Sequence, residues 1–246
     1  MLEVEGLSKI YGGLRAVDRA SLRVAEGAIA GLIGPNGAGK TTLFAAITGF
    51  ALPDEGRVRF AGVDITGRAP HRICAQGMVR TFQITQPFAQ LSVRENIMVG
   101  AYLHTPDRDE AAARAEAVAR QVGMAALLDR TAAGLTVAGR KRLELARALA
   151  TRPKLLLLDE VMAGLNPSEI DEIIPVIRGI RDAGVTVFLI EHVMRAVMSL
   201  AENVHVLSYG KIIAEGAPRV LAADPVVIEA YLGHGAAQRL AGAAHA

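Results

Sequence analysis

Hydrophobic and polar positions alternate in several segments of the first third of the chain. Residues 2–7, 20–25 and 57–61 show this alternation, which predicts strands with one exposed face in an antiparallel sheet. Residues 28–33 (AIAGLI) are apolar throughout, as is typical of a strand buried on both faces. The segment 41–50 that follows the next glycine-rich turn is predicted to be a helix.

The middle of the chain has a helical pattern. Residues 109–122 are rich in alanine and place Glu and Arg four positions apart, which favours a helix. Residues 141–151 carry apolar side chains at helical spacing. The pattern therefore predicts that residues 90–150 form an all-helical subdomain.

Short apolar runs return after the helical part and predict further buried strands at residues 155–158 and 185–190. A helix is predicted between them over residues 167–181, with Asn166 as its N-cap. Residues 204–214 predict a hairpin around Tyr209 and Gly210, and the weakly patterned residues 238–246 a frayed end. Strands alternating with helices predict an α/β fold.

Composition and charge exclude several classes of protein. The 246 residues are 51% hydrophobic and 21% charged, which is globular rather than disordered. A formal net charge of +2 gives no case for nucleic acid as a partner. A single cysteine, Cys74, excludes an intramolecular disulfide, and the acidic start predicts no signal peptide. The mean hydropathy of +0.30 is high, although no uncharged apolar stretch approaches the roughly 18 residues of a membrane helix.

A phosphate-binding loop is predicted between the buried strand at residues 28–33 and the following helix. Its pattern is G-x-x-x-x-G-K-[ST], in which glycines let main-chain N–H groups wrap a phosphate and the helix N-terminus adds a positive dipole. Lys40 supplies a charge for the β and γ phosphates, and the Thr41 hydroxyl is a predicted Mg²⁺ ligand. The alternative is a glycine-rich turn without a ligand. The predicted ATP-binding residues of the loop are Gly34, Pro35, Asn36, Gly37, Ala38, Gly39, Lys40, Thr41 and Thr42.

Two acidic residues end the strand predicted at residues 155–158. Asp159 is placed to bind Mg²⁺, and Glu160 to polarise a water molecule. Acidic residues often end strands, so the pair alone is weak evidence and a structural role for Glu160 stays an alternative. Its order after the phosphate loop predicts nucleotide hydrolysis.

With these motifs in order, the sequence resembles the ATP-binding subunits of ABC transporters over nearly its whole length. The resemblance is closest to the ATPase subunits of branched-chain amino-acid importers, through VRTFQ, AGLNPSE, IIAEG and the tail DPVVIEAYLG at residues 224–233. It implies a P-loop NTPase core with a mostly parallel sheet, an antiparallel β subdomain and an inserted α-helical subdomain. The implied division is residues 1–89, 90–150, 151–215 and 216–246, the last a helical tail.

The resemblance assigns roles to residues outside the phosphate loop. Tyr11 matches the aromatic residue that stacks on adenine, and Gln83 the Q-loop glutamine that contacts Mg²⁺ and the attacking water. Asn166 matches the D-loop and His192 the switch histidine at the γ-phosphate, while Glu160 is the implied general base. The simpler alternatives are a surface aromatic for Tyr11, a solvated side chain for Gln83 and a helix cap for His192.

The signature segment departs from the family pattern L-S-G-G-Q. Here it is LTVAG at residues 135–139, in which Thr136 replaces the serine and Gly139 stands where glutamine is usual. The two intervening glycines are Val137 and Ala138, which makes close approach to the partner's ATP harder. A one-residue slip that places Gly139 on the second glycine is an alternative alignment. The basic run that follows, with Arg147 and Arg152, is interpreted as a solvated helix face, and the alternative is that it adds positive potential near the partner's ATP.

The family resemblance implies two ATPase subunits that close head to tail on two ATP molecules and drive two membrane permease subunits. A substrate-binding protein is an indirect partner, and the implied location is the cytoplasmic face of the inner membrane, as a peripheral subunit. The altered signature favours a heterodimer over a homodimer. The apolar residues Phe88 and Leu91, in the segment 85–97, predict a groove for a permease helix.

The predicted function is therefore ATP hydrolysis that powers import of branched-chain amino acids or related substrates. An ATPase subunit of an ABC exporter of lipid or lipopolysaccharide is the alternative with the same core motifs. A soluble ABC ATPase of repair or translation and a nucleotide-binding module without hydrolysis are less favoured. The single phosphate loop and the pair Glu160 and His192 argue against these two.

Overall fold

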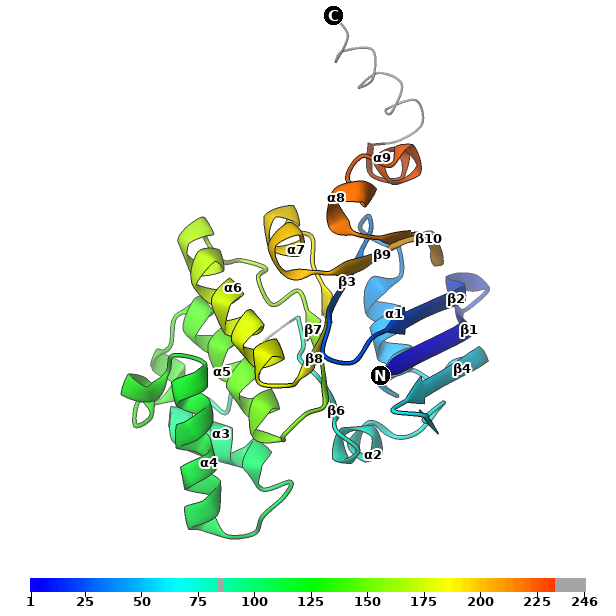
Figure 1. The fold of residues 1–246 in the computed structure, drawn as a ribbon. Coiled ribbons are helices and arrows are strands. Elements are labelled where there is room, and N and C mark those ends of the chain that lie inside the picture. The colour runs from blue at the N-terminus through cyan, green and yellow to red at the C-terminus, as the bar shows by residue number, and fades with distance from the viewer. Residues whose placement is uncertain (84–85, 233–246) are drawn as a thin grey trace, which may run out of the picture. The chain divides into compact units, whose positions relative to one another are not determined.

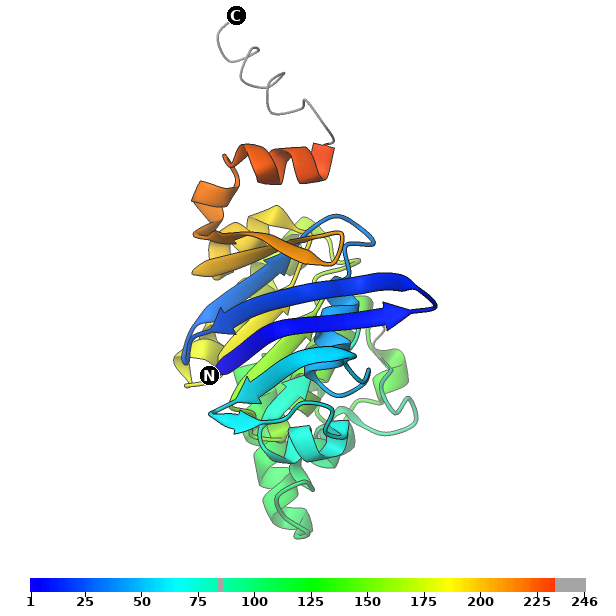
Figure 2. The same cartoon turned by 90° about the vertical axis from the view of Figure 1, so that its right-hand side faces the viewer.

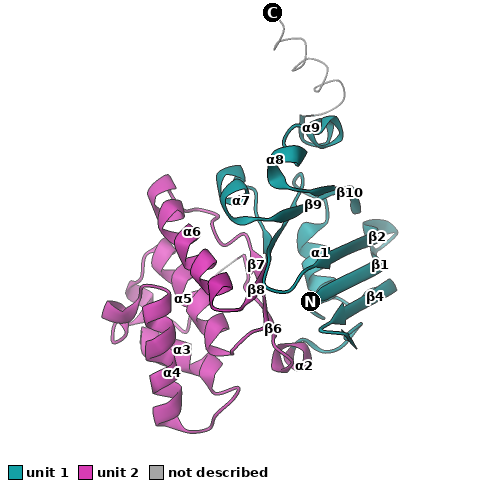
Figure 3. Ribbon diagram, viewed as in Figure 1, with its two compact units in different colours: residues 1–70, 188–246 teal, residues 71–187 magenta. Residues whose placement is uncertain are grey.

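The protein divides into two compact units, each made of segments that come together from the chain. The structure, a computed structural model, describes residues 1–83 and 86–232. Unit 1 is formed by Met1–Pro70 with Phe188–Ala246, and unit 2 by His71–Val187 (Figure 3). Strand β8, Thr186–Ile190, begins in unit 2 and ends in unit 1, and all five of its residues are buried.

Unit 1 contains an antiparallel sheet with the strand order β2-β1-β4-β5 (Figure 2). The register pairs Leu2 with Val24 and with Phe60 of the two neighbouring strands. Apolar side chains on one face are buried while polar ones alternate with them, as the sequence predicts. The strands are β1 Leu2–Tyr11, β2 Leu14–Val24, β4 Glu55–Phe60 and β5 Val63–Asp64.

The second sheet segment of unit 1 has the order β10-β9-β3. Strand β3, Ile29–Ile33, is wholly buried and runs parallel to β9, Asn203–Ser208, while β10, Lys211–Gly216, is the antiparallel partner of β9. Helix α1, Lys40–Ile47, follows β3, and the ring of its Phe44 lies 4.9 Å from that of Phe188. The remaining helices are α7 Met194–Leu200, α8 Pro218–Leu221 and α9 Pro225–Leu232 (Figure 1).

Unit 2 combines two parallel strands with a group of helices. Strand β6, Met78–Arg80, pairs with β7, Leu155–Asp159, which is buried throughout. The helices α3, α4 and α5 contact one another through alanine, valine and leucine side chains. The helices are α2 Pro70–Ala75, α3 Val93–Ala101, α4 Arg108–Gln121, α5 Val137–Ala150 and α6 Pro167–Asp182, with 3-10 turns at Ala125–Leu127 and Ala132–Gly134.

The predicted α/β class is confirmed, with two differences in detail. Helix α5 begins at Val137 rather than at residue 141, because the Thr136 side chain accepts a hydrogen bond from the N–H of Gly139 and caps the helix there. Strand β6 was not predicted, since three residues carry too little pattern to be recognised. The four-part division of the chain stays a prediction, and residues 233–246 lie outside the described part.

A buried histidine gives unit 1 a pH-dependent element. His205 in β9 is fully buried, its Nε2 lies 3.2 Å from the carbonyl oxygen of Arg23 and its Nδ1 lies 3.4 Å from the Glu215 carboxylate. Burial lowers the pKa of His205 below its usual value, although Glu215 and the Arg23 carbonyl oppose that shift. The folded protein therefore holds the neutral imidazole more firmly than the unfolded chain does.

We expect the free energy of unfolding to fall as the pH drops below about 6.5, the ordinary histidine pKa, because the unfolded chain then binds a proton that the folded chain resists. The maximum slope from this one group is about 1.4 kcal/mol per pH unit. Urea unfolding of the wild type and of His205→Gln at pH 5.5, 6.5 and 7.5 measures the effect. A variant whose pH dependence equals that of the wild type would contradict it.

Candidate functional site

The predicted phosphate loop lies between β3 and α1 in unit 1, as the sequence indicates. All three of its glycines adopt positive φ angles that favour glycine, 152° at Gly34, 78° at Gly37 and 102° at Gly39, the N-cap of α1. A Cβ on Gly34 would clash with the main-chain oxygen of Leu207, and one on Gly39 with that of Ala16. The loop can therefore pass against its neighbours only because these positions lack side chains.

The loop lysine is held by the loop itself. The Lys40 ammonium donates to the carbonyl oxygens of Gly34 at 2.8 Å and Pro35 at 2.9 Å, and the residue is only 6% exposed. Thr41 at the start of α1 is exposed. A cation and a helix N-terminus that face one loop form a site for a polyphosphate.

Tyr11 and His192 also belong to unit 1 and are exposed. The Tyr11 side chain at the end of β1 is 49% exposed, and the Lys9 ammonium lies 5.2 Å from the centre of its ring. An accessible aromatic face is what base stacking requires. His192 lies two residues after the end of β8. Their roles toward a nucleotide stay predictions.

Asp159 is the last residue of β7 in unit 2, and its carboxylate is almost completely buried. The Arg80 Nη2 donates to its Oδ2 at 2.6 Å, and the two side chains are 6% and 1% exposed. The hydroxyl of buried Thr81 accepts from the Asp159 N–H at 3.2 Å, which fixes the end of the strand. Sequence reasoning missed both residues, although they precede Gln83 directly and a basic residue near a strand-end carboxylate is a usable signal.

The predicted catalytic residues Gln83 and Glu160 lie together. The Gln83 Nε2 donates to the Glu160 Oε2 at 2.7 Å. Glu160 has a φ angle of 49°, an uncommon left-handed conformation for a residue with a side chain. The Lys141 ammonium donates to the carbonyl oxygens of Gln83 at 3.0 Å and Glu160 at 3.4 Å. Lys141 was missed because a basic run after the signature was interpreted as solvated, whereas this residue is 5% exposed.

The signature and D-loop positions both cap helices. Thr136 is the N-cap of α5, and its oxygen accepts from Gly139 N at 3.1 Å. Asn166 is the predicted N-cap of α6, where its side chain accepts from Glu169 N at 3.0 Å and Glu169 accepts from Asn166 N at 2.9 Å. The predicted cap at Asn166 is confirmed, while the contacts of both residues with a partner's nucleotide stay predictions.

The oxygen atoms of the predicted metal-binding residues are of the kind that bind Mg²⁺. Within residues 1–83 and 86–232 no group of three or more His, Cys, Asp or Glu forms a metal cluster, so no all-protein cage is found there. Among the same residues the Asp159 Oδ1 is buried and has no hydrogen-bond partner. A buried carboxylate oxygen left open in this way suits a cation that takes most of its other ligands from phosphate and water.

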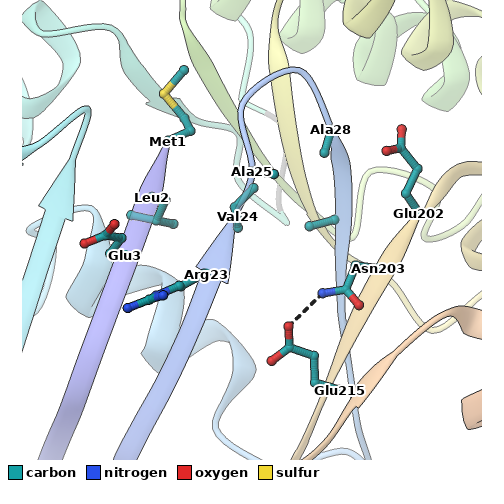
Figure 4. A pocket seen from close by; sticks show the side chains of 11 residues that line it. Met1, Leu2, Glu3, Arg23, Val24, Ala25, Ala28, Glu202, Asn203 and Glu215 are labelled. Atoms are coloured by element: carbon teal, nitrogen blue, oxygen red, sulfur yellow. Dashed lines mark hydrogen bonds between the residues drawn. The ribbon is translucent and has the colours of Figure 1, made fainter.

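A cavity of about 460 Å³ in unit 1 is separate from these residues. It is lined by the ends of β1 and β2 and by parts of β3, β9 and β10 (Figure 4). Asn203 donates to the Glu215 carboxylate at 2.9 Å at its wall. None of the predicted site residues lines it, so it is not the predicted nucleotide site.

Comparison with known proteins places the chain in a family. The family model described as "ABC transporter" matches residues 17–163. The chain belongs to the ABC transporter family. A second model, described as "branched-chain amino acid ATP-binding cassette transporter", matches residues 211–237, where the sequence tail had indicated that subfamily. The chain is thus a nucleotide-binding ATPase of the ABC type.

Individual relatives cover nearly the whole chain. The high-affinity branched-chain amino acid transport ATP-binding protein BraF of Pseudomonas aeruginosa is 40% identical, over 95% of this chain and 98% of the relative. LivG of Escherichia coli, which carries the same description, is 37% identical with the same coverage.

Solved structures agree with the fold. A nucleotide-free ATP-binding cassette from an ABC transporter has a TM-score of 0.88 and 33% identity, over 95% of this chain and 99% of that one. A cassette solved in its ADP conformation has a TM-score of 0.87, with the same identity and coverage. The predicted P-loop NTPase architecture is confirmed. No helix in the described part of this ABC ATPase is both long and apolar enough to cross a membrane.

We expect Arg80→Met to destabilise the protein by about 3–5 kcal/mol, because it leaves the Asp159 carboxylate buried without its cation. Adding Asp159→Asn should restore much of the loss. Urea unfolding without nucleotide measures both variants. The matched control is Arg120→Met, an exposed cation of α4, expected within about 0.5 kcal/mol of wild type. An Arg80→Met value as small as the control would show that the ion pair is not needed.

Proposed function

We propose that this ABC ATPase powers the import of branched-chain amino acids or related small substrates through separate permease subunits. The observation that carries the proposal is the match of residues 211–237 to the branched-chain cassette model. Relatives at 37–40% identity carry the same description in their names. Core motifs are shared with lipid exporters, so this C-terminal match is what favours the importer.

The phosphate loop binds the triphosphate in this proposal. Main-chain N–H groups from Gly34 to Thr42 wrap the β and γ phosphates. The Lys40 ammonium donates to the carbonyl oxygens of Gly34 and Pro35, and when the nucleotide binds it replaces some of these hydrogen bonds with bonds to phosphate oxygens. The exposed Tyr11 ring stacks on adenine. Binding then needs no rearrangement of the backbone between β3 and α1.

Mg²⁺ is the proposed cofactor, held by the hydroxyl of Thr41, the carboxylate of Asp159 and the side chain of Gln83. When bound, the ion offsets the negative charge that develops on the phosphates. The open Asp159 Oδ1 is the observation that supports its place in this set. Arg80 keeps the other oxygen occupied and so fixes the orientation of the carboxylate.

Glu160 is the proposed general base or water-positioning group of the hydrolysis. Its carboxylate already accepts from the Gln83 amide, so these two side chains hold a water molecule between them only after that bond opens. His192 contacts the γ-phosphate in the same scheme, and Asn166 acts at the partner's nucleotide. Thr136 and Gly139 serve the partner's ATP from the start of α5.

The proposed assembly contains two membrane permease subunits, a second ATPase subunit and, indirectly, a substrate-binding protein. This chain would lie at the cytoplasmic face of the inner membrane as a peripheral subunit. Unit 2 has exposed apolar side chains that suit a permease helix: Phe88, and Val99, Tyr102 and Leu103 at helical spacing along and just after α3. Of the predicted groove segment 85–97, Thr85 lies outside the described residues. Leu91, predicted to be exposed like Phe88, is only partly exposed, and its N–H donates to the Phe88 carbonyl oxygen at 3.0 Å.

We expect Glu160→Gln to lower ATPase kcat at least about 100-fold while Mg-ATP binding stays within about twofold, because the amide keeps the size of the side chain but not its basicity. Steady-state phosphate release and displacement of a fluorescent ATP analogue measure the two quantities. Lys40→Met, which removes the phosphate contact, should instead weaken binding itself. Wild-type turnover in Glu160→Gln would remove Glu160 from the mechanism.

The same variant tests whether the transporter contains two unequal ATP sites. If the second ATPase is a different chain with a regular signature, the site built on Lys40 and Glu160 of this chain is the stronger. Glu160→Gln should then reduce transport more than the matching change in the partner. Equal losses would indicate a homodimer or equivalent sites.

We expect Phe88→Asp to uncouple ATP hydrolysis from transport, because a charge on an apolar docking surface weakens contact with the permease without touching the nucleotide residues. The measurement is ATPase activity and substrate uptake in reconstituted vesicles. Val220→Asp, at an apolar position of unit 1 that is 68% exposed against 47% for Phe88, is the control. Normal coupling in Phe88→Asp would place the permease contact elsewhere.

A further inference from the structure

Lys141 is a buried cation whose hydrogen bonds lead to the main chain of both predicted catalytic residues. It lies within α5, five positions after the signature threonine at the helix N-cap. Its ammonium reaches the carbonyl oxygens of Gln83 and Glu160, whose side chains are bonded to each other at 2.7 Å. Burying an ammonium group costs free energy unless it is hydrogen-bonded. Lys141 is only 5% exposed, so its bonds to these two carbonyl oxygens offset that cost.

The same face of α5 holds the segment around Gln83 at two further points. The Glu144 carboxylate accepts from the N–H of Phe82 at 2.6 Å. The Arg147 guanidinium donates to the carbonyl oxygen of Gln86 at 3.0 Å and lies 4.8 Å from the centre of the Phe88 ring. Positions 141, 144 and 147 are three residues apart and so share one side of the helix. Phe82, Gln86 and Phe88 are therefore each in contact with this side of the helix.

The backbone of Glu160 also needs support. Its φ angle of 49° costs about 1–2 kcal/mol for a residue with a Cβ, and such a conformation persists only where the surroundings hold it. The bond from Lys141 to the Glu160 carbonyl is one such restraint. Loss of that bond would let the Glu160 carboxylate leave the Gln83 amide.

We infer that Lys141 is a positioning residue of the ATPase site: it holds the carbonyls of Gln83 and Glu160 and ties both to the helix that starts at the signature segment. The inference rests on the proposed roles of Gln83 and Glu160 and adds a residue to them. Engagement of the signature by the partner's nucleotide thereby acts on the catalytic carboxylate of this chain's own site through one rigid helix.

The test compares Lys141→Met, which keeps length but removes charge and donors, with Lys141→Arg, which keeps both. Arg120→Met is the control for loss of a cation in unit 2. We expect Lys141→Met to lower kcat about 10–100-fold with KM and the Kd for Mg-ATP within about twofold, and Lys141→Arg to recover most of the rate. Phosphate release and displacement of a fluorescent ATP analogue, on the full chain in its transporter, give these values.

The outcomes separate this inference from the proposed function. A wild type that neither binds nor hydrolyses ATP overturns the proposed function and the inference with it. An active wild type with unchanged kcat in Lys141→Met, or with losses confined to KM, overturns the inference alone. A loss that Lys141→Arg does not recover also overturns it. If Lys141→Met does not fold, Lys141→Gln, which keeps an amide donor without charge, takes its place under the same criteria.

A double-variant cycle adds a readout that a purely structural role would not move. If Lys141 acts by placing Gln83, the loss of rate in Lys141→Met combined with Gln83→Ala should be well below the product of the single losses. Independent, multiplicative losses would contradict the inference.

Discussion

A carboxylate at the end of an entirely apolar strand places a strong constraint on unit 2. Asp159 follows four buried leucines of β7, and a charge in that position is tolerated only with a cation and hydrogen bonds around it. Arg80 supplies the cation and Thr81 holds the backbone. Because both lie two or three residues before Gln83, the segment that compensates Asp159 also carries Gln83, the predicted Q-loop glutamine, which lies beside Glu160. Residues 80–83 therefore both compensate the buried charge of Asp159 and supply Gln83 to the predicted catalytic pair.

Unit 1 meets a different constraint at the phosphate loop, where main chain must approach main chain. Gly34 and Gly39 pass so close to Leu207 and Ala16 that no side chain fits. The loop is thus braced against β9 and β2, and its amides are in place before a ligand arrives. Pre-arranged donors of this kind bind a phosphate without a large ordering cost.

The strands, most helices and the motif residues were predictable because their signals are local. Continuous apolar runs such as residues 28–33 and 155–158 predict buried strands. Asn166 followed by Pro167 predicts the start of a helix. The short strand β6 was not predictable, and neither were the roles of Arg80 and Lys141. Arg80 bonds to Asp159, 79 positions away in the sequence, and Lys141 bonds to Gln83, 58 positions away. A basic residue after the signature looks solvated until the packing of α5 is known. The same limit applies to the fully buried His205, whose neighbours Arg23 and Glu215 lie on other strands.

The altered signature changes the side chains on the surface proposed to face the partner's nucleotide more than it changes the main-chain N–H donors at the start of α5. With Thr136 as N-cap, the Gly139 N–H is bonded to the Thr136 side chain, and the donors at the start of α5 are the main-chain N–H groups of Val137 and Ala138, which do not depend on the side chains there. Val137, however, is 55% exposed where the predicted alignment has glycine, so its branched side chain stands on the surface that the partner's phosphate would approach in the proposed assembly. A Cβ at Gly139 would lie 3.3 Å from the Leu135 Cβ, so the usual glutamine could be restored there only with a small shift. In the proposed assembly the consequence would fall on the partner's ATP, while Lys40, Asp159 and Glu160 keep the family pattern, and this difference is the physical argument for the proposal of two unequal sites.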